Sequence, residues 1–378
     1  MSHSITPSVA LPLCTYAPST QVRISEAGPA DAGEMTQFHN RHHRDNREPS
    51  FWLWEYVAHL PGKSVFLAAR ERDRVVGTQG MIPINLRVGG EVVLTGKSEH
   101  SLIEPAFRGH GLWRRLYRQA LGVCSEHGMA AVWGFTPVAE ACRGLAALGF
   151  SQYDVLDEAV TILSVTAAAR VVWGSAEPPW FKAILTLGLP FLAARQRAAR
   201  WFCRREGGEF EFRAEPRAPD DFARFNERLA HAAPGVVRLE LSGEYLEWRL
   251  HRHPLRRLRI RLLYHDGDIV ACALVNDERR LRPVIVDIAF SAPHAGRVLL
   301  ARLMDEFAAD GAGIVLLAAN RKNPLGREVL AAAVRLGAVR RRARSVFVVR
   351  ALDQRASPAA LDPAAWQLSL LWFEGYAV

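Results

Sequence analysis

The chain has 378 residues, of which 49% are hydrophobic and 23% charged, a composition typical of a globular protein with an internal core. At about 100–200 residues per domain, this length predicts two domains. The formal net charge is +9, yet only four of the 48 basic residues are lysine. This arginine bias is typical of a GC-rich genome, so the charge does not by itself indicate a nucleic-acid-binding protein. No DNA partner is expected, and an anionic cofactor would account for part of the charge equally well.

Three classes of protein are disfavoured by the sequence. The five cysteines are scattered and form no C-x-x-C pair, so neither a disulfide framework nor a zinc site is expected, which favours a reducing cytoplasm. The segment 1–16 lacks the basic start and apolar run of a signal peptide. No stretch of 18 apolar residues occurs, so no membrane span is predicted.

The chain repeats one pattern of elements. The aromatic segment 51–56 corresponds to 244–249, and the hairpin-like stretch 65–77 corresponds to 259–271. Since further matches keep the same order, we interpret the chain as a duplication of one α/β unit. The expected fold class is α/β in the α+β sense, with two domains that each contain a mixed, twisted sheet flanked by helices. The expected divisions are a first domain at 1–165, a helical linker at 166–208 and a second domain at 209–378.

The expected linker contains Trp180, an apolar stretch that follows it, and then five arginines. One interpretation is an amphipathic helix that contacts an anionic membrane surface through residues 180–205. The other, which we favour, is a linker helix that packs its apolar face on one or both domains.

A glycine turn stands at the centre of the first half. The sequence Arg108-Gly109-His110-Gly111 follows a predicted strand that ends at Ile103 and precedes a predicted helix that begins at Leu112. Glycine permits a sharp turn and a close approach to a ligand. A helix N-terminus offers unpaired N–H groups and the positive end of a dipole, which suit a pyrophosphate. A turn that needs glycine for its shape alone is the alternative.

This turn resembles the CoA-binding signature of the GNAT acyltransferase superfamily, R/Q-x-x-G-x-G/A. Arg108 and Gly111 match its first two fixed positions, whereas Trp113 stands where Gly or Ala is usual. The predicted strand at 130–135 and the ending Leu148-Gly149-Phe150 continue the resemblance. The chain is also similar to bacterial proteins with tandem GNAT-like domains, so the resemblance implies two such domains here.

The resemblance implies roles for particular residues. The strand through Leu102 and Ile103 would hydrogen-bond the pantetheine arm of acetyl-CoA or another acyl-CoA. The backbone amides of the turn and the first helical residues would hold the pyrophosphate; these belong to Gly109, His110, Gly111, Leu112 and Trp113. The second half has Gly296 opposite Arg108 and Leu299 opposite Gly111, so it is expected to be a degenerate copy without this site.

Catalytic candidates lie on the strand before the turn. GNAT enzymes resemble one another in direct attack by an amine on the thioester, with a base that is often a carboxylate or histidine. Glu99 and His100 are the candidates, and strand alternation places them on opposite faces. Leu145 occupies the position of the tyrosine that serves many members as the acid. Tyr153 or Tyr117 would then take that role, unless no side chain does.

Two further groups of residues have alternative interpretations. Trp52, Trp54 and Tyr56 would line the acceptor site or, as we favour, belong to the core. The cluster His39, His42 and His43 raises the question of a metal, but the sequence near it completes no ligand spacing, so we expect a solvated loop and no metal site.

The resemblance therefore implies an acyl-CoA-dependent N-acyltransferase, with an acetyl donor and a small amine or amino sugar as acceptor. One alternative is an aminoacyl-tRNA-dependent transferase of the tandem GNAT type, to which the basic charge is suited. That group does not need the Arg-Gly-x-Gly turn that this chain keeps. The other alternative is a non-catalytic protein that binds CoA or a partner.

Overall fold

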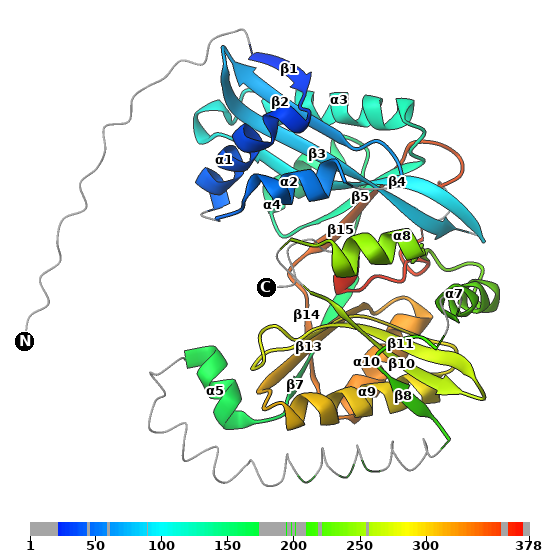
Figure 1. Ribbon diagram of the computed structural model, residues 1–378. Helices are drawn as coiled ribbons and strands as arrows, with labels where there is room; N and C mark the ends of the chain where they lie inside the picture. The colour runs from blue at the N-terminus through cyan, green and yellow to red at the C-terminus, as the bar shows by residue number, and fades with distance from the viewer. Residues whose placement is uncertain are drawn as a thin grey trace, which may run out of the picture.

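The computed structural model describes residues 22–43, 46–58, 61–88, 90–173, 194, 198, 201, 209–217, 221–254, 257–356 and 362–372. They form two lobes, each built on a mixed sheet flanked by helices (Figure 1). This confirms the predicted fold class. No helix in the described parts of the chain is long and apolar enough to cross a membrane.

The sheet of the first lobe has the strand order β1-β2-β3-β4-β5-β15-β6, with the short β9 also paired to β3. Its strands are β1 (Val22–Glu26), β2 (Val65–Glu71), β3 (Arg74–Val88), β4 (Glu91–Ile103), β5 (Ala131–Thr136), β6 (Ser151–Tyr153), β9 (Arg238–Leu239) and β15 (Val346–Ala351). Helices α3 (Leu112–Glu126) and α4 (Ala139–Ala146) share a core cluster with one face of this sheet. Helices α1 (Ala32–His43) and α2 (Pro49–Tyr56) pack on the other face.

The sheet of the second lobe has the order β14-β7-β13-β12-β11-β10-β8. Its strands are β7 (Leu156–Ile162), β8 (Glu211–Arg213), β10 (Arg259–His265), β11 (Asp268–Asn276), β12 (Val284–Phe290), β13 (Ile314–Asn320) and β14 (Val339–Arg342). Helices α9 (Pro293–Ala309) and α10 (Pro324–Arg335) cover the outer face of this sheet. On the inner side lie α7 (Asp221–Ala232), α8 (Gly243–Leu246) and the π-helical segment η3 (Glu247–His251).

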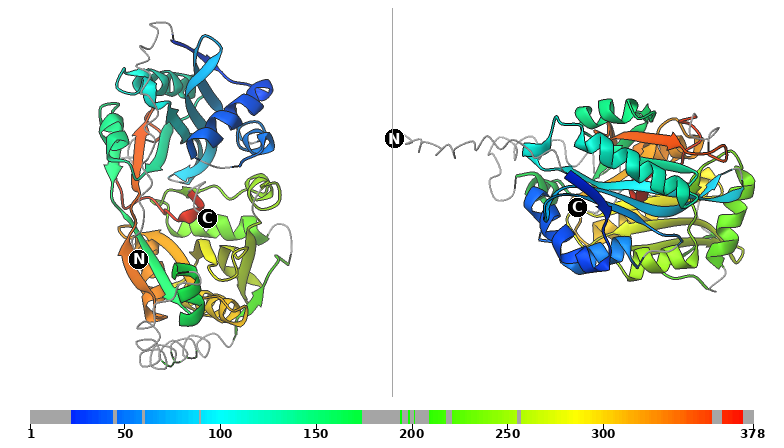
Figure 2. Two further views of the ribbon diagram at one scale, coloured as in Figure 1. Left: turned by 90° about the vertical axis from the view of Figure 1, so that its left-hand side faces the viewer. Right: turned by 90° about the horizontal axis from the view of Figure 1, so that it is seen from above.

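The two sheets exchange strands. β7 comes from the first half of the chain but pairs with β13 and β14 of the second lobe. In return β15, from the second half, pairs with β5 and β6 of the first lobe, and the two views of Figure 2 show both crossings. The expected boundary near residue 165 therefore does not separate the two sheets. Each sheet needs a strand from the other half to be complete.

The largest apolar cluster lies between the lobes and includes residues of both halves. Trp54 of α2 and Trp248 of η3 stack there with ring centroids 4.6 Å apart and planes 10° apart. Each indole N–H donates to the backbone carbonyl of the other residue at 3.1 Å. These residues occupy corresponding places in the sequence repeat, so equivalent positions of the two copies meet at the interface. Buried stacking and two satisfied N–H groups both stabilise it.

The expected linker lies almost entirely outside the described residues. Within it the structure describes α5 (Val165–Trp173) and the exposed single positions Ala194, Ala198 and Trp201. The membrane-contact and linker-helix interpretations of 180–205 therefore both stay predictions.

The C-terminal segment, residues 362–372, packs between the lobes (Figure 1), and the side chains of Asn320 and Asn323 donate hydrogen bonds to its backbone carbonyls. Asn320, fully buried at the end of β13, donates its side-chain amide to the carbonyls of Pro363 and Trp366 at 2.8 and 2.7 Å. Its side-chain oxygen accepts from the Lys322 amide at 2.9 Å. A side chain that satisfies three backbone groups in a buried place cannot be replaced without leaving some of them unpaired.

Replacement of Asn320 by Ala should therefore lower the free energy of unfolding by about 2–4 kcal/mol, since it leaves buried carbonyls without a donor. Urea unfolding followed by circular dichroism measures this change. Gln119→Ala, on the exposed side of α3, is the control and should change stability by less than about 0.5 kcal/mol. Equal stability of the two variants would contradict the assigned role of Asn320.

Candidate functional site

The glycine turn lies where β4 ends and α3 begins, as predicted. A short 3-10 turn at Pro105–Phe107 leads into Arg108, whose Nε donates to the Ile103 carbonyl at 3.0 Å. Gly109 and Gly111 have φ angles of +81° and +76°, which L side chains rarely adopt. A Cβ added to either glycine would meet no atom within 4 Å. The glycines are therefore needed for backbone conformation, and the turn faces space that a ligand can enter.

The parallel strands β4 and β5 separate just before this turn. Their recorded pairing is limited to Gly96 with Val132 and Lys97 with Trp133, although β4 continues to Ile103. We call the gap beyond Lys97 the first fork. Leu102 and Ile103 lie on its β4 side and pair with β3 on the other side. An extended ligand placed in the fork would find main-chain polar groups on β4 to pair with.

β4 has a bulge inside this stretch. Thr78 pairs with Leu102 and Gly80 with Glu99, so β4 has one extra residue relative to β3. His100 sits at the bulge with a φ of +50°, and its carbonyl accepts from the Thr78 hydroxyl at 2.9 Å. A non-glycine residue held in the left-handed region costs about 1–3 kcal/mol and is found most often at functional sites.

The His100 side chain pairs with a buried glutamate. Its Nε2 lies 3.0 Å from a carboxylate oxygen of Glu55, whose side chain is fully buried on α2. Arg47 Nη1 lies 3.3 Å from the same nitrogen. An imidazole nitrogen that carries a proton donates to Glu55, and the same nitrogen without a proton accepts from Arg47. Both protonation states of His100 therefore have a partner.

Sequence reasoning identified His100 but missed Glu55 and Arg47. Glu55 is the one acidic residue within the aromatic segment 51–56. A carboxylate on an otherwise apolar helix face was the available signal, because a buried charge needs a partner.

The expectation that the histidine cluster lies in a solvated loop was wrong. His39, His42 and His43 lie on α1 rather than in a loop, and His39 is buried. Its ring stacks on that of His100 at 4.7 Å and on that of His43 at 4.4 Å. Burial lowers the pKa of His42. Among the described residues no group of three His, Cys, Asp or Glu side chains could hold a metal ion.

Glu99 and Tyr117 point toward other partners. Glu99 lies 2.8 Å from the Nζ of the buried Lys97, so its carboxylate is engaged in an ion pair. The Tyr117 hydroxyl lies 2.7 Å from the Ser98 Oγ, beside the first fork. Burial raises the pKa of Tyr117, so its phenol stays protonated and is a weaker acid than in water.

The remaining candidates are placed as follows. Leu145 is buried in the core next to α3 and offers no acid there. Tyr153 lies on β6, separated from β5 by β15. Trp52, Trp54 and Tyr56 are at most 5% exposed and belong to the core between the lobes. A Cβ on Gly80 would be 2.2 Å from the Tyr56 hydroxyl oxygen, so that hydroxyl lies against the bulge.

Trp113 spans the space beside the first fork. Its indole Nε1 donates to the Ser101 hydroxyl of β4 at 2.7 Å. The ring also packs on Gly144 of α4, where an added Cβ would be 2.6 Å away, and against the Tyr117 ring at 5.0 Å. The indole therefore connects β4 to α4 along the path from the glycine turn into the fork.

The second lobe has the same strand separation but a different filling. β12 and β13 pair only at Val284 with Leu316 and Ile285 with Leu317. We call the gap beyond these pairs the second fork, and the C-terminal segment fills it. Ser369 forms a β-bridge with Ala319, and the backbone N–H of Asn320 donates to the Leu368 carbonyl at 3.2 Å.

The position in the second lobe that corresponds to the glycine turn also differs from the first lobe. Gly296 lies inside α9, and a Cβ there would be 2.4 Å from the Phe290 ring. This glycine is helical and packs against the core, so the second fork has the strand geometry without a turn of positive-φ glycines at this position.

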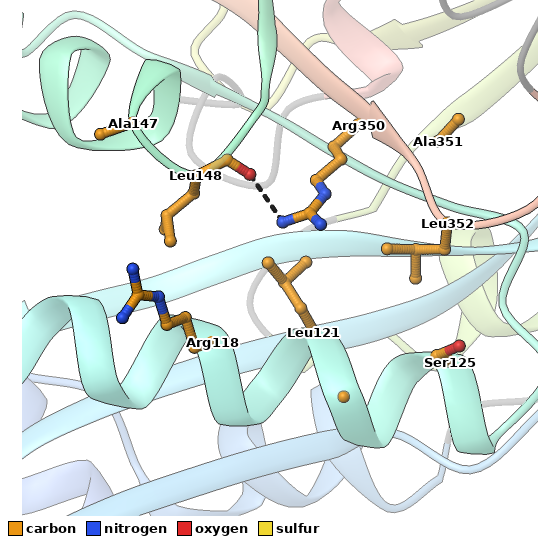
Figure 3. A pocket seen from close by; sticks show the side chains of 9 residues that line it. Arg118, Leu121, Ser125, Ala147, Leu148, Arg350, Ala351 and Leu352 are labelled. Atoms are coloured by element: carbon orange, nitrogen blue, oxygen red, sulfur yellow. Dashed lines mark hydrogen bonds between the residues drawn. The ribbon is translucent and has the colours of Figure 1, made fainter.

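A basic pocket lies farther along α3 (Figure 3). Arg118 approaches it from α3 and Arg350 from the exchanged strand β15, and Arg350 Nη1 donates to the Leu148 carbonyl at 2.6 Å. Leu121 and Leu352 form its apolar floor. The strand exchange thus brings a cation from the second half of the chain next to the helix that carries the glycine turn.

Comparison with known proteins agrees with this geometry. Residues 23–142, which contain the glycine turn and the first fork, match the acetyltransferase (GNAT) domain family. This part of the chain is therefore a GNAT acetyltransferase domain. No curated protein matches the chain.

Several solved structures share the two-lobed GNAT fold. A probable N-acyltransferase of unknown function from Enterococcus faecalis is 10% identical with a TM-score of 0.60, covering 89% of this chain and 74% of its own. A GCN5-related N-acetyltransferase from Kribbella flavida is 15% identical with a TM-score of 0.55, covering 88% and 71%. Another from Anabaena variabilis is 11% identical with a TM-score of 0.58, covering 88% and 73%. At these identities the likeness concerns the fold.

The tryptophan in the GNAT signature gives a direct prediction. Trp113→Ala should lower the dissociation constant for CoA by about five- to tenfold, because a ligand then no longer has to displace an indole and break its hydrogen bond to Ser101. Isothermal titration calorimetry measures the constant. Ser101→Ala, which removes only the hydrogen bond, should give a smaller gain. Weaker binding to Trp113→Ala would mean that the indole contacts the ligand instead of obstructing it.

Proposed function

We propose that the protein is an acyl-CoA-dependent N-acyltransferase that transfers an acetyl group to a small amine, such as an amino sugar. The observation that carries this proposal is the glycine turn at the N-terminus of α3, next to the first fork. The turn supplies unpaired N–H groups, a helix dipole and space without a covering side chain. These are the properties that the pyrophosphate of CoA requires, and the match of residues 23–142 to the GNAT domain family supports the proposal.

His100 is the group we assign as general base. The amine nitrogen attacks the thioester carbonyl, the C–N bond forms, and a proton must leave the nitrogen. His100 accepts this proton, directly or through a water molecule, and Glu55 stabilises the imidazolium across a distance of 3.0 Å. Glu99 is less suited, because its carboxylate already lies 2.8 Å from Lys97 Nζ and would have to leave this ion pair to accept a proton.

The leaving thiolate needs a proton when the C–S bond breaks. A free thiol has a pKa of about 8.5, and burial raises the pKa of Tyr117 above its usual value. Transfer of a proton from this phenol to the thiolate would therefore run uphill. The imidazolium of His100 is the better donor, since return of the amine proton to the thiolate balances the reaction. A site that uses one group in both steps is compatible with leucine at position 145.

Replacement of His100 by Gln should lower kcat/KM by about 10²–10⁴-fold while the dissociation constant for acetyl-CoA stays unchanged. In the wild type the rate should rise with pH as the base loses its proton, and this rise should be absent from the variant. Thiol release from acetyl-CoA with a panel of amines and amino sugars measures both.

Two controls separate the possible outcomes. Glu55→Gln keeps the base but removes the negative charge beside it, so it should retain more activity than His100→Gln. His43→Gln, at the exposed end of the histidine stack, should be close to wild type. Binding of acetyl-CoA without turnover of any amine would contradict the enzymatic proposal and support a CoA-binding role.

A further inference from the structure

A small cavity lies between the lobes, where β9, α7, β12 and the C-terminal segment meet. Its polar lining comes from Asn226, Arg238, Asp287 and Gln367, and Trp372 closes one side. The space, about 20 Å³, holds a single water-sized group.

Arg238 has no hydrogen-bond partner in this cavity. The residue is 8% exposed, and all three guanidinium nitrogens are buried without an acceptor among the described residues. Loss of solvation, helped by the nearby Arg87, lowers the pKa of Arg238 to about 10. The side chain is therefore still charged at neutral pH. A buried cation that has lost its water and gained no acceptor is strongly destabilising.

The neighbouring acidic side chains do not supply the missing hydrogen-bond acceptor. Glu240 accepts from Arg87 Nε at 2.6 Å, so these two charges cancel each other. Asp287 also faces the cavity, but the described ion pairs do not join it to Arg238. Loss of solvation raises the pKa of Asp287, against the opposite effect of its hydrogen bond with Ser369. The charge of Asp287 opposes the effect of burial on the Arg238 pKa, but the guanidinium nitrogens are still left without a hydrogen-bond acceptor among the described residues.

The position of Asp287 links this cavity to the first lobe. Glu99 pairs with Gly80 next to the bulge of β4, and Asp287 pairs with Leu274 next to a register shift of β12. Because β4 and β12 have equivalent neighbours in their sheets, the two acids occupy equivalent places. In the first lobe Glu99 forms an ion pair with Lys97. At the equivalent place beside Asp287, the Arg238 guanidinium has no hydrogen-bond acceptor among the described residues.

We propose that this cavity binds one compact monovalent anion, of the size of chloride, through the Arg238 guanidinium. The anion supplies the missing acceptor for a planar, charged donor. The room available excludes phosphate and larger acids. Since Gln367 and Trp372 line the same space, a bound anion also fixes the C-terminal segment to the lobe interface. The inference does not depend on the proposed acyltransferase activity.

Thermal unfolding of the full-length protein tests this at constant ionic strength, with chloride replacing the bulky anion gluconate. The wild-type Tm should rise saturably by about 4 °C at an anion concentration near 100 times the dissociation constant. Arg238→Gln should show no saturable rise. Arg228→Gln, which removes an exposed arginine paired with Asp268, should respond like the wild type.

Two further measurements keep the inference testable if Arg238→Gln does not fold. Asp287→Asn removes the remaining negative charge, so its response should saturate at a lower anion concentration than that of the wild type. Crystals of the wild type grown in bromide should give an anomalous peak within hydrogen-bond distance of the Arg238 guanidinium. A wild-type Tm that does not depend on the anion, or a crystal grown in bromide that lacks this peak, would overturn the proposal.

Discussion

The early separation of two parallel strands is the constraint on which both lobes depend. In each sheet the central parallel pair holds together for two residue pairs and then opens. Opened strands leave main-chain groups that must find other partners. In the second lobe the C-terminal segment supplies them, through Leu368 and Ser369. In the first lobe the space beyond Lys97 lies beside a glycine turn, and Trp113 and Tyr117 of α3 reach β4 there through hydrogen bonds to Ser101 and Ser98.

This difference separates the roles of the two copies. The first lobe keeps positive-φ glycines at the start of α3, whereas the second has a helix that begins at Pro293 and a glycine packed against Phe290. The exchange of β7 and β15 binds the copies into one unit, because neither sheet is complete without the other half. The stacked pair Trp54 and Trp248 then joins equivalent positions across the interface. The second copy thus supports the first through a shared core.

Much of this arrangement could be predicted from the sequence. Glycine spacing, strand patterns and the internal repeat identified the turn, the fork strands and the degenerate second copy. The exchange of β7 and β15 could not be predicted, because a strand's own residues do not specify which of two similar sheets it joins. The repeat even favoured pairing within each half.

The chemistry of the site was predicted less completely. His100 was found from its place on β4, but its partner Glu55 comes from α2, far along the chain, and a long-range pair leaves no local pattern. The histidine cluster was misread because polar residues in a row suggested a loop. In the loop interpretation the His39 ring would stay in solvent. In the structure α1 continues through it and its buried ring stacks on that of His100, which makes the burial favourable.

The most direct test of the central claim is calorimetric titration of acetyl-CoA into the wild type and into Arg108→Ala/Gly111→Ala. Saturable binding by the wild type, weakened at least about tenfold in the double variant, is the expected result, because Ala strains the left-handed turn and the positive charge is gone. Gly267→Ala has the same kind of strain at a positive φ in the second lobe and should bind like the wild type. No binding by the wild type, or equal affinity in the double variant, would contradict a CoA site at this turn.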